Sequence, residues 1–152
     1  MFSTDFKEFV ELLNKHGVDY LIVGGYAVGL HGHPRYTGDI DFWIRPDCAN
    51  AERLLKAVAD FGLTILNIPI EELVTPGKVF QLGRQPYRID ILNAIDGVEF
   101  AGCYERRATF ELEGVLVPFI GLDDLKENKR ASGRHKDLAD LEVLESTIEE
   151  GE

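Results

Sequence analysis

Two aspartates that stand two residues apart, Asp39 and Asp41, are the first residues whose spacing could support chemistry. They belong to segment 39–44, Asp-Ile-Asp-Phe-Trp-Ile, in which they alternate with apolar residues as in a half-buried β-strand. Both carboxylates therefore leave the same face of the strand, with Cα atoms about 6.5–7 Å apart. Carboxylates this close repel each other, and a divalent cation between them would relieve the repulsion. A site made of oxygen ligands alone favours Mg²⁺ or Mn²⁺.

A third aspartate, Asp90, stands in a similar setting. It alternates with Ile89 and Ile91 in another predicted strand, so its carboxylate also leaves the apolar face. Three carboxylates carried by strands could hold two metal ions for phosphoryl or nucleotidyl transfer. A purely structural role for the three acids stays open, and it would require them to be dispersed in the fold.

The glycine pair Gly24 and Gly25 stands where a predicted strand, 19–23, leads into a short predicted helix, 26–30. Glycines let a backbone approach a phosphate closely, and a helix N-terminus offers free N–H groups. The pair has neither the GxGxxG spacing of a dinucleotide site nor the GK[ST] of a P-loop. A tight strand-to-helix turn that binds nothing would also need glycine, so this alternative remains.

The glycine pair, the aspartate pair fourteen residues after it and the isolated strand aspartate together resemble the nucleotidyltransferase superfamily, which includes polymerase-beta-like enzymes. Segment 35–41, Arg-Tyr-Thr-Gly-Asp-Ile-Asp, is similar to the R-x-T-x-D-h-D form of small bacterial AbiEii-like nucleotidyltransferases. Segment 128–141 is similar to the Lys…Gly-Arg-x-Lys-Asp-x-x-Asp signature of that group. The resemblance spans about residues 19–141, and the superfamily usually has serine where this chain has Gly25.

The resemblance implies a catalytic role for the three acids. Asp39 and Asp41 would bind the Mg²⁺ that carries a nucleoside triphosphate, and Asp90 would bind a second metal ion or act as the general base. Gly24 and Gly25 would hold the β- and γ-phosphates. Chemistry of this kind depends mainly on positioning and on charge stabilisation.

The segment 126–136 is locally basic although the chain is acidic, because it carries five basic residues and one acid. The resemblance places Lys129 at the nucleotide, and Arg35 could reach the same phosphates from the loop before the aspartate pair. Arg134 is a further candidate for the nucleotide or for an RNA acceptor. The alternative is a solvated helix face whose cations pair with the aspartates that follow it.

Two further features attract a functional interpretation. His31 and His33 could suggest a metal site, but two histidines in a loop rich in glycine and proline more often have no such role. Trp43 shares a strand face with the aspartate pair. It could line the nucleotide pocket or cover the edge of the sheet, and the sequence does not decide between them.

The elements that must position these residues follow from periodicity and turn signals. Strands are predicted at 19–23, 39–44, 63–68, 79–82, 87–92, 109–112 and 115–120, the last four as two hairpins. Helices are predicted at 3–16, 26–30, 49–61 and 122–149, with caps at Ser3 and Asp47 and a break at Ser132 and Gly133. This order predicts an α/β (α+β) fold in which helices flank a mixed, largely antiparallel sheet. One nucleotidyltransferase domain would span 1–152, with C-terminal helices from about residue 122.

Composition excludes several classes of protein. The 152 residues include 27 acidic and 16 basic side chains, for a net charge of −11. This disfavours a non-specific nucleic-acid coat and a binder of anionic membranes. No segment is predicted to be a transmembrane helix or a signal peptide. The two cysteines, Cys48 and Cys103, lack zinc-site spacing, and we expect a reducing, cytoplasmic setting.

The sequence thus predicts a Mg²⁺-dependent enzyme that moves a nucleoside monophosphate from a triphosphate to a hydroxyl of a protein, a tRNA or a small molecule. The resemblance alone implies a toxin–antitoxin or phage-defence context, with a toxin or antitoxin as partner. The competing hypothesis is a non-catalytic module that binds a nucleotide or a partner and retains the fold. Gly25 in place of serine favours this second hypothesis.

Overall fold

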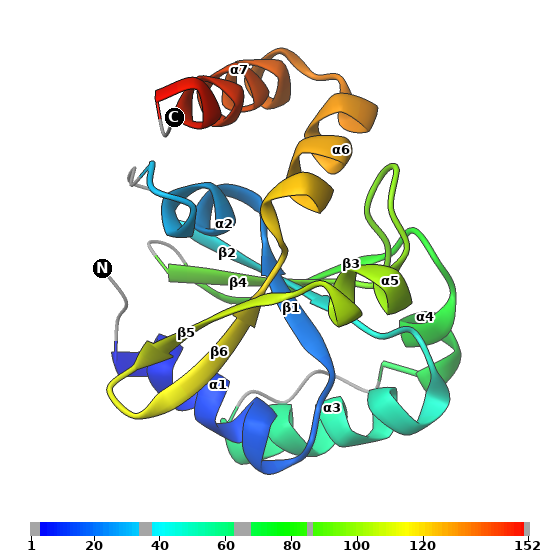
Figure 1. Cartoon of the computed structure of the whole chain (residues 1–152). Helices are drawn as coiled ribbons and strands as arrows, with labels where there is room; N and C mark the ends of the chain where they lie inside the picture. The colour runs from blue at the N-terminus through cyan, green and yellow to red at the C-terminus, as the bar shows by residue number, and fades with distance from the viewer. Residues whose placement is uncertain (1–3, 34–37, 63–67, 85–86, 151–152) are drawn as a thin grey trace.

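The computed structural model of the chain describes residues 4–33, 38–62, 68–84 and 87–150. Within these residues, six strands form one mixed sheet in the order β3-β4-β2-β1-β6-β5 (Figure 1). The strands are β1 (Tyr20–Val23), β2 (Asp39–Ile44), β3 (Val79–Arg84), β4 (Tyr87–Leu92), β5 (Ala108–Leu112) and β6 (Val115–Phe119). Three neighbouring pairs are antiparallel, and β1 with β6 and β2 with β4 are parallel. The predicted fold class is confirmed.

Helices cover both faces of the sheet. They are α1 (Thr4–Lys15), α2 (Gly24–Leu30), α3 (Cys48–Asp60), α4 (Ile70–Val74), α5 (Phe100–Glu105), α6 (Leu122–Ser132) and α7 (His135–Glu150). Helices α1 and α3 lie against one face, and α2, α5, α6 and α7 lie on the other (Figure 1). In the described part of the chain, no helix is both long enough and apolar enough to cross a membrane.

Strand β2 shows how its alternating sequence divides between the two layers. Ile40, Phe42 and Ile44 point into the larger core, where Phe42 packs against aromatic rings of α1. The other face carries the aspartates and, two residues further on, Trp43, which belongs to the smaller core beneath α5, α6 and α7. A half-buried strand requires this alternation, and it directs the carboxylates into the layer of α6 and α7.

Most predicted elements agree with the structure to within a residue or two. The bounds of β2 are as predicted, and Asp47 caps α3 by accepting a hydrogen bond from Asn50 N at 2.7 Å. The predicted break between the last two helices is also confirmed, because Gly133 ends α6 with φ +67°. The left-handed region is open to glycine at little cost.

The differences concern short elements. Helices α4 and α5 were not predicted, because five or six residues are too few to show a clear helical period and α5 contains Gly102. Helix α2 starts at Gly24, two residues earlier than predicted. The predicted Ser3 cap, and all but the last residue of the strand predicted at 63–68, lie outside the described residues, and Ile68 is not in a strand.

Candidate active site

Parallel pairing of β2 with β4 brings the three predicted acids together. Asp41 stands opposite Asp90 in the register, and Asp39 stands opposite Arg88 two positions earlier. Neighbouring strands lie about 4.8 Å apart, and residues directly opposite each other project from the same face. The three carboxylates therefore share one small area of the sheet. The alternative in which these acids are dispersed is wrong.

Arg88 lies among the three carboxylates and was missed as a site residue. Its Nη2 donates to Asp39 Oδ2 at 2.8 Å, and its Nε lies 3.2 Å from Asp90 Oδ1. The aspartate pair was expected to have no cation neighbour within its own strand, but the adjacent strand supplies one. Arg88 stands two residues before Asp90, so strand parity could have placed it on the carboxylate face.

The environment of Asp41 disfavours its charged form. Burial, the nearby carboxylates of Asp90 and Asp39, and a hydrogen bond with Asp90 together raise the pKa of Asp41 to about 6. Burial also raises the pKa of Asp90, although the Arg88 guanidinium opposes this shift. The site therefore concentrates more negative charge than the protein itself neutralises.

Gly24 is the residue that brings the start of α2 against Asp41. Its φ is +72°, and a Cβ at this position would overlap Asp41 Oδ2. The preceding residue, Val23, is the register partner of Asp41 on the antiparallel neighbour β1. Gly25 is not one of the described glycines that have a positive φ. The first glycine of the pair is thus required by two independent constraints, whereas the second has no positive φ.

Substitution Gly24→Ala should therefore destabilise the protein by more than about 2 kcal/mol, from the positive φ and from the displacement of Asp41. The matched variant Gly25→Ala, in the first turn of α2, should change stability by less than about 1 kcal/mol. Urea unfolding of both variants measures the difference. Equal stability of the two would show that the close approach of Gly24 to Asp41 is unimportant.

A cavity of about 180 Å³ adjoins the carboxylates. Asp41 lines it from the sheet and Gly24 from the start of α2, Lys129 lines it from α6 and Arg134 from the turn before α7, and residues 94–96 close another side. Four of the predicted site residues thus border one cavity. Its mixture of backbone, anionic and cationic groups suits part of a nucleotide better than an apolar ligand.

Lys129 is a buried residue of α6 that forms ion pairs with α7. Its side chain is 5% exposed, and its Nζ lies 3.2 Å from Asp137 Oδ1 and 3.1 Å from Asp140 Oδ2. Asp137 also accepts hydrogen bonds from Ser132 Oγ at 2.6 Å and Arg134 Nε at 2.7 Å. Burial alone would raise the pKa of Asp137, but these hydrogen bonds outweigh it and lower the pKa to about 2. Both Lys129 and Arg134 therefore pair with the aspartates that follow them, as the alternative prediction stated.

Two cations at the start of α7 act on the carboxylate site. The exposed Lys136 is close enough to lower the pKa of Asp41, and Asp41 in turn raises the pKa of Arg134, although hydrogen bonding to Asp137 is the largest cause there. Lys136 was not among the predicted nucleotide contacts, although it belongs to the basic segment. Both side chains are exposed and accessible to an anionic ligand beside Asp41.

The remaining predicted site residues have separate outcomes. Arg35 falls in 34–37, outside the described residues. His31 Nε2 donates to the carbonyl of Ile120 at 2.8 Å and its ring packs on Phe119, so it has a structural role. Among the described residues, no group of three or more His, Cys, Asp or Glu side chains is arranged to hold a metal ion. At the carboxylate site, the Arg88 guanidinium forms ion pairs with Asp39 and Asp90.

Comparison with known proteins shows the family of the chain. Residues 2–152 match the family model described as a nucleotidyl transferase of unknown function, DUF2204. A search of the curated proteins found no match.

Solved structures share the fold at low sequence identity. Lincomycin-bound LnuA, a lincosamide antibiotic adenylyltransferase, has a TM-score of 0.60 and 16% identity over 96% of this chain and 98% of that one. TM1012 of Thermotoga maritima, assigned as a nucleotidyltransferase, has a TM-score of 0.59 and 15% identity over 95% of this chain and 90% of that one. An antigenic nucleotidyltransferase-like protein of Paracoccidioides brasiliensis has a TM-score of 0.51 and 15% identity over 89% of this chain and 71% of that one. The predicted resemblance to the superfamily is confirmed. This chain belongs to the nucleotidyl transferase family DUF2204 and is a nucleotidyltransferase.

Proposed function

We propose that this protein transfers a nucleoside monophosphate from a nucleoside triphosphate to a hydroxyl group, with Mg²⁺ or Mn²⁺ as cofactor. The observation that carries the proposal is the convergence of Asp39, Asp41 and Asp90 beside Gly24 and the adjoining cavity. Three strand carboxylates next to a glycine-started helix provide both the anionic site and the backbone approach that the reaction needs.

The residues present fit a divalent cation chemically. Asp90 Oδ1 is buried and, apart from its ion pair with Arg88 Nε, has no hydrogen-bond partner among the described residues, and Asp41 is held in an environment that disfavours its charge. Metal ions commonly stabilise the attacking and leaving oxygens in phosphoryl transfer, as in polymerases. Asp39, Asp41 and Asp90 would hold the ion, which supplies positive charge for the triphosphate when bound. Arg88 balances part of the carboxylate charge.

The protein's own residues have distinct roles in this proposal. The backbone at Gly24 and Gly25 faces the phosphates, and Arg134 and Lys136 attract them electrostatically. Asp90 accepts the proton of the acceptor hydroxyl as its oxygen bonds to the α-phosphorus. The bond from the α-phosphorus to its bridging oxygen then breaks, and pyrophosphate leaves.

A small molecule is the acceptor that we favour among the three predicted classes. LnuA is named for a small antibiotic that it adenylylates, and it matches this chain over nearly the whole length of both. The comparison shows the fold alone, so the small acceptor is an inference that the size match supports. A tRNA or protein acceptor, a toxin or antitoxin partner and a cytoplasmic location stay predictions from the sequence.

Transfer can be tested with two labels on the same nucleotide. Incubation with Mg²⁺, a mixture of small hydroxylated metabolites and [α-³²P]ATP, GTP, CTP or UTP should label an acceptor, whereas the γ-labelled nucleotides should release labelled pyrophosphate only. Asp41→Asn serves as the inactive variant and Asp5→Asn, on α1 at the opposite face of the sheet, as its matched control. Transfer of the γ-label would contradict nucleotidyl transfer, and nucleotide binding without any transfer would favour the non-catalytic module.

A further inference from the structure

A second, larger cavity of about 580 Å³ lies beside the first one. Ala94, in the connection between β4 and α5, lines both cavities. The walls of the second cavity are largely apolar, with Trp43, Val98 and Phe100 among them. Its volume is in the range of about 300–1,000 Å³ that small-molecule sites occupy. No role has been assigned to this cavity so far.

Trp43 connects this cavity to the carboxylate site. It follows Asp41 by two residues on β2 and shares its face of the sheet, so their Cα atoms lie about 6.5–7 Å apart. Trp43 is 1% exposed, and its Nε1 has no hydrogen-bond partner among the described residues. A buried donor without a partner is costly, and a ligand oxygen that reached it would remove the cost. Trp43 stands on an interior strand, so it does not cover the edge of the sheet, and it lines the second cavity rather than the cavity beside the carboxylates.

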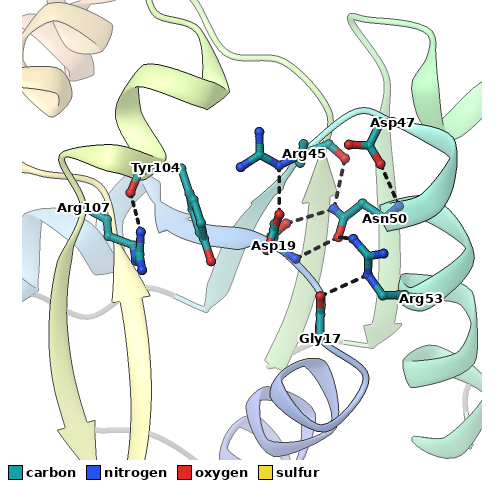
Figure 2. Close-up of polar contacts among 8 residues, drawn as sticks. All are labelled: Gly17, Asp19, Arg45, Asp47, Asn50, Arg53, Tyr104 and Arg107. Atoms are coloured by element: carbon teal, nitrogen blue, oxygen red, sulfur yellow. Dashed lines mark hydrogen bonds and ion pairs between the residues drawn. The ribbon is translucent and has the colours of Figure 1, made fainter.

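Arg45 lines this cavity, and Figure 2 shows its contact with Asp19. Its Nε donates to Asp19 Oδ2 at 2.8 Å, and its guanidinium lies over the rings of Phe100 and Tyr104 at 5.0 and 5.3 Å. Asn50 fixes the backbone beneath it, because Nδ2 donates to the carbonyls of Asp19 and Arg45, both at 3.0 Å. Within the described structure, the two terminal nitrogens of Arg45 make no hydrogen bond. They are therefore preorganised donors for an oxygen atom.

The charges at this rim favour a cationic ligand over an anionic one. Asp19 already balances the charge of Arg45. The carboxylates of Asp47 and Glu99 also line the cavity, and in the described part of the chain neither forms an ion pair with a Lys or Arg. Asp47 accepts only the capping hydrogen bond of α3, and Glu99 caps nothing with its side chain. A phosphate or a nucleic-acid backbone would be repelled here, whereas an amine would be attracted.

We infer that this cavity is the acceptor subsite and takes a small ring compound that carries an amine and oxygen substituents. The ring packs against Trp43 and Phe100, whose rings contact each other edge to face at 5.1 Å, the amine meets Glu99, and oxygens face the donors of Arg45 and Trp43. The inference rests on the proposed function, since it places a hydroxyl of this compound toward Asp41 of the first cavity, which shares Ala94 with the second.

The single tryptophan makes the cavity observable without any reaction, because Trp43 is the only one in the chain. Three probes share one phenol ring and differ in charge: tyramine is cationic, 4-ethylphenol is neutral and 4-hydroxyphenylacetate is anionic. Tyramine should change Trp43 fluorescence saturably, with a dissociation constant on the order of 1 mM, as expected of a fragment-sized ligand. The anionic probe should bind at least about tenfold more weakly, because it meets the carboxylate rim.

Two exposed glutamates on or beside α5 provide the matched variants. Glu99→Gln removes the carboxylate from the rim and should weaken tyramine binding about threefold to tenfold, leaving 4-ethylphenol binding unchanged. Glu105→Gln, at the far end of the same helix and outside the cavity, should leave both unchanged. Equal binding of the cationic and anionic probes, no effect of Glu99→Gln, or no saturable change at all would overturn the inference.

Asp41→Asn separates this inference from the proposed function. The variant should lose transfer but still bind tyramine, because Asp41 does not line the second cavity. Tyramine binding without transfer by the wild-type protein would leave the cavity assignment standing as a binding site and contradict its role as an acceptor subsite. Transfer by the wild-type protein without binding of any probe would overturn the cavity assignment and leave the proposed function intact.

Discussion

Replacement of Asp41 by asparagine should abolish nucleotidyl transfer and at the same time make the metal-free protein more stable. The loss of transfer, about 10³-fold or more, follows from removing one of the three carboxylates that would hold the cation. The gain in stability follows from the environment of Asp41, which is partly buried next to two other carboxylates. Asparagine keeps the shape of the side chain and removes the charge that this environment disfavours. A catalytic residue can carry such a cost to stability.

The stability difference should depend on pH in a defined direction. In the folded protein the pKa of Asp41 is raised from 3.8 to about 6, so the folded state binds more protons than the unfolded state between these values. The contribution of protonated Asp41 to the stability of the folded protein is therefore fully present below about pH 4 and is lost as the pH rises through about 6. The shift corresponds to at most about 3 kcal/mol, and we expect about 1–2 kcal/mol because asparagine is still a partly buried polar group.

Urea unfolding of the wild type and of Asp41→Asn in the presence of a metal chelator, at pH 4 and at pH 7.5, measures this effect. The two proteins should be similar at pH 4, and the variant should be more stable at pH 7.5. Asp39→Asn is the control within the same site, since the Asp39 side chain is 37% exposed and paired with Arg88. It should lose transfer without gaining stability. A variant at position 41 that keeps transfer, or that is less stable at pH 7.5, would contradict the placement of Asp41 in a crowded acidic site.

The elements that bear these residues were predictable where a local pattern is sufficient. The alternation in β2 identifies its two faces, and Asp47 and Gly133 mark helix ends through hydrogen bonding and backbone conformation. These signals need no knowledge of distant residues. The three acids were found for the same reason, since each one interrupts an apolar strand in a regular way.

The assembly of the site was not predictable from such patterns. The register that sets Asp41 opposite Asp90 depends on which strands pair, and no local signal specifies a parallel partner almost fifty residues away. The position of Arg88 among the carboxylates follows from that register. Likewise, the enclosure of Lys129 by Asp137 and Asp140 depends on the turn at Gly133, which folds α7 back against α6. A helical spacing within one continuous helix would not produce this contact.

Substitution of Lys129 by methionine should cause a large loss of stability, about 3–5 kcal/mol. Lys129, Asp137 and Asp140 have side chains that are 5%, 2% and 7% exposed, so removing the cation leaves two buried carboxylates beside each other. Methionine replaces the apolar stem of lysine with little change in volume, so charge is the main difference. Urea unfolding at pH 7.5 measures the loss. Arg130→Gln, at the next position of α6 with an exposed side chain in surface pairs, should cost less than about 1 kcal/mol.

The double variant Lys129→Met with Asp140→Asn tests whether repulsion is the cause. Removing one of the two carboxylates should restore part of the stability, since residues in one network couple by about 0.5–3 kcal/mol. Asp137 would retain its hydrogen bonds from Ser132 and Arg134. If Lys129 also contacts the nucleotide, the double variant should be more stable than the single one and still bind ATP weakly. Full recovery of ATP binding together with stability would show that Lys129 acts only by holding α7 to α6. Unchanged stability of Lys129→Met would show that Lys129 does not hold α7 to α6, and it would leave nucleotide binding as the role of Lys129.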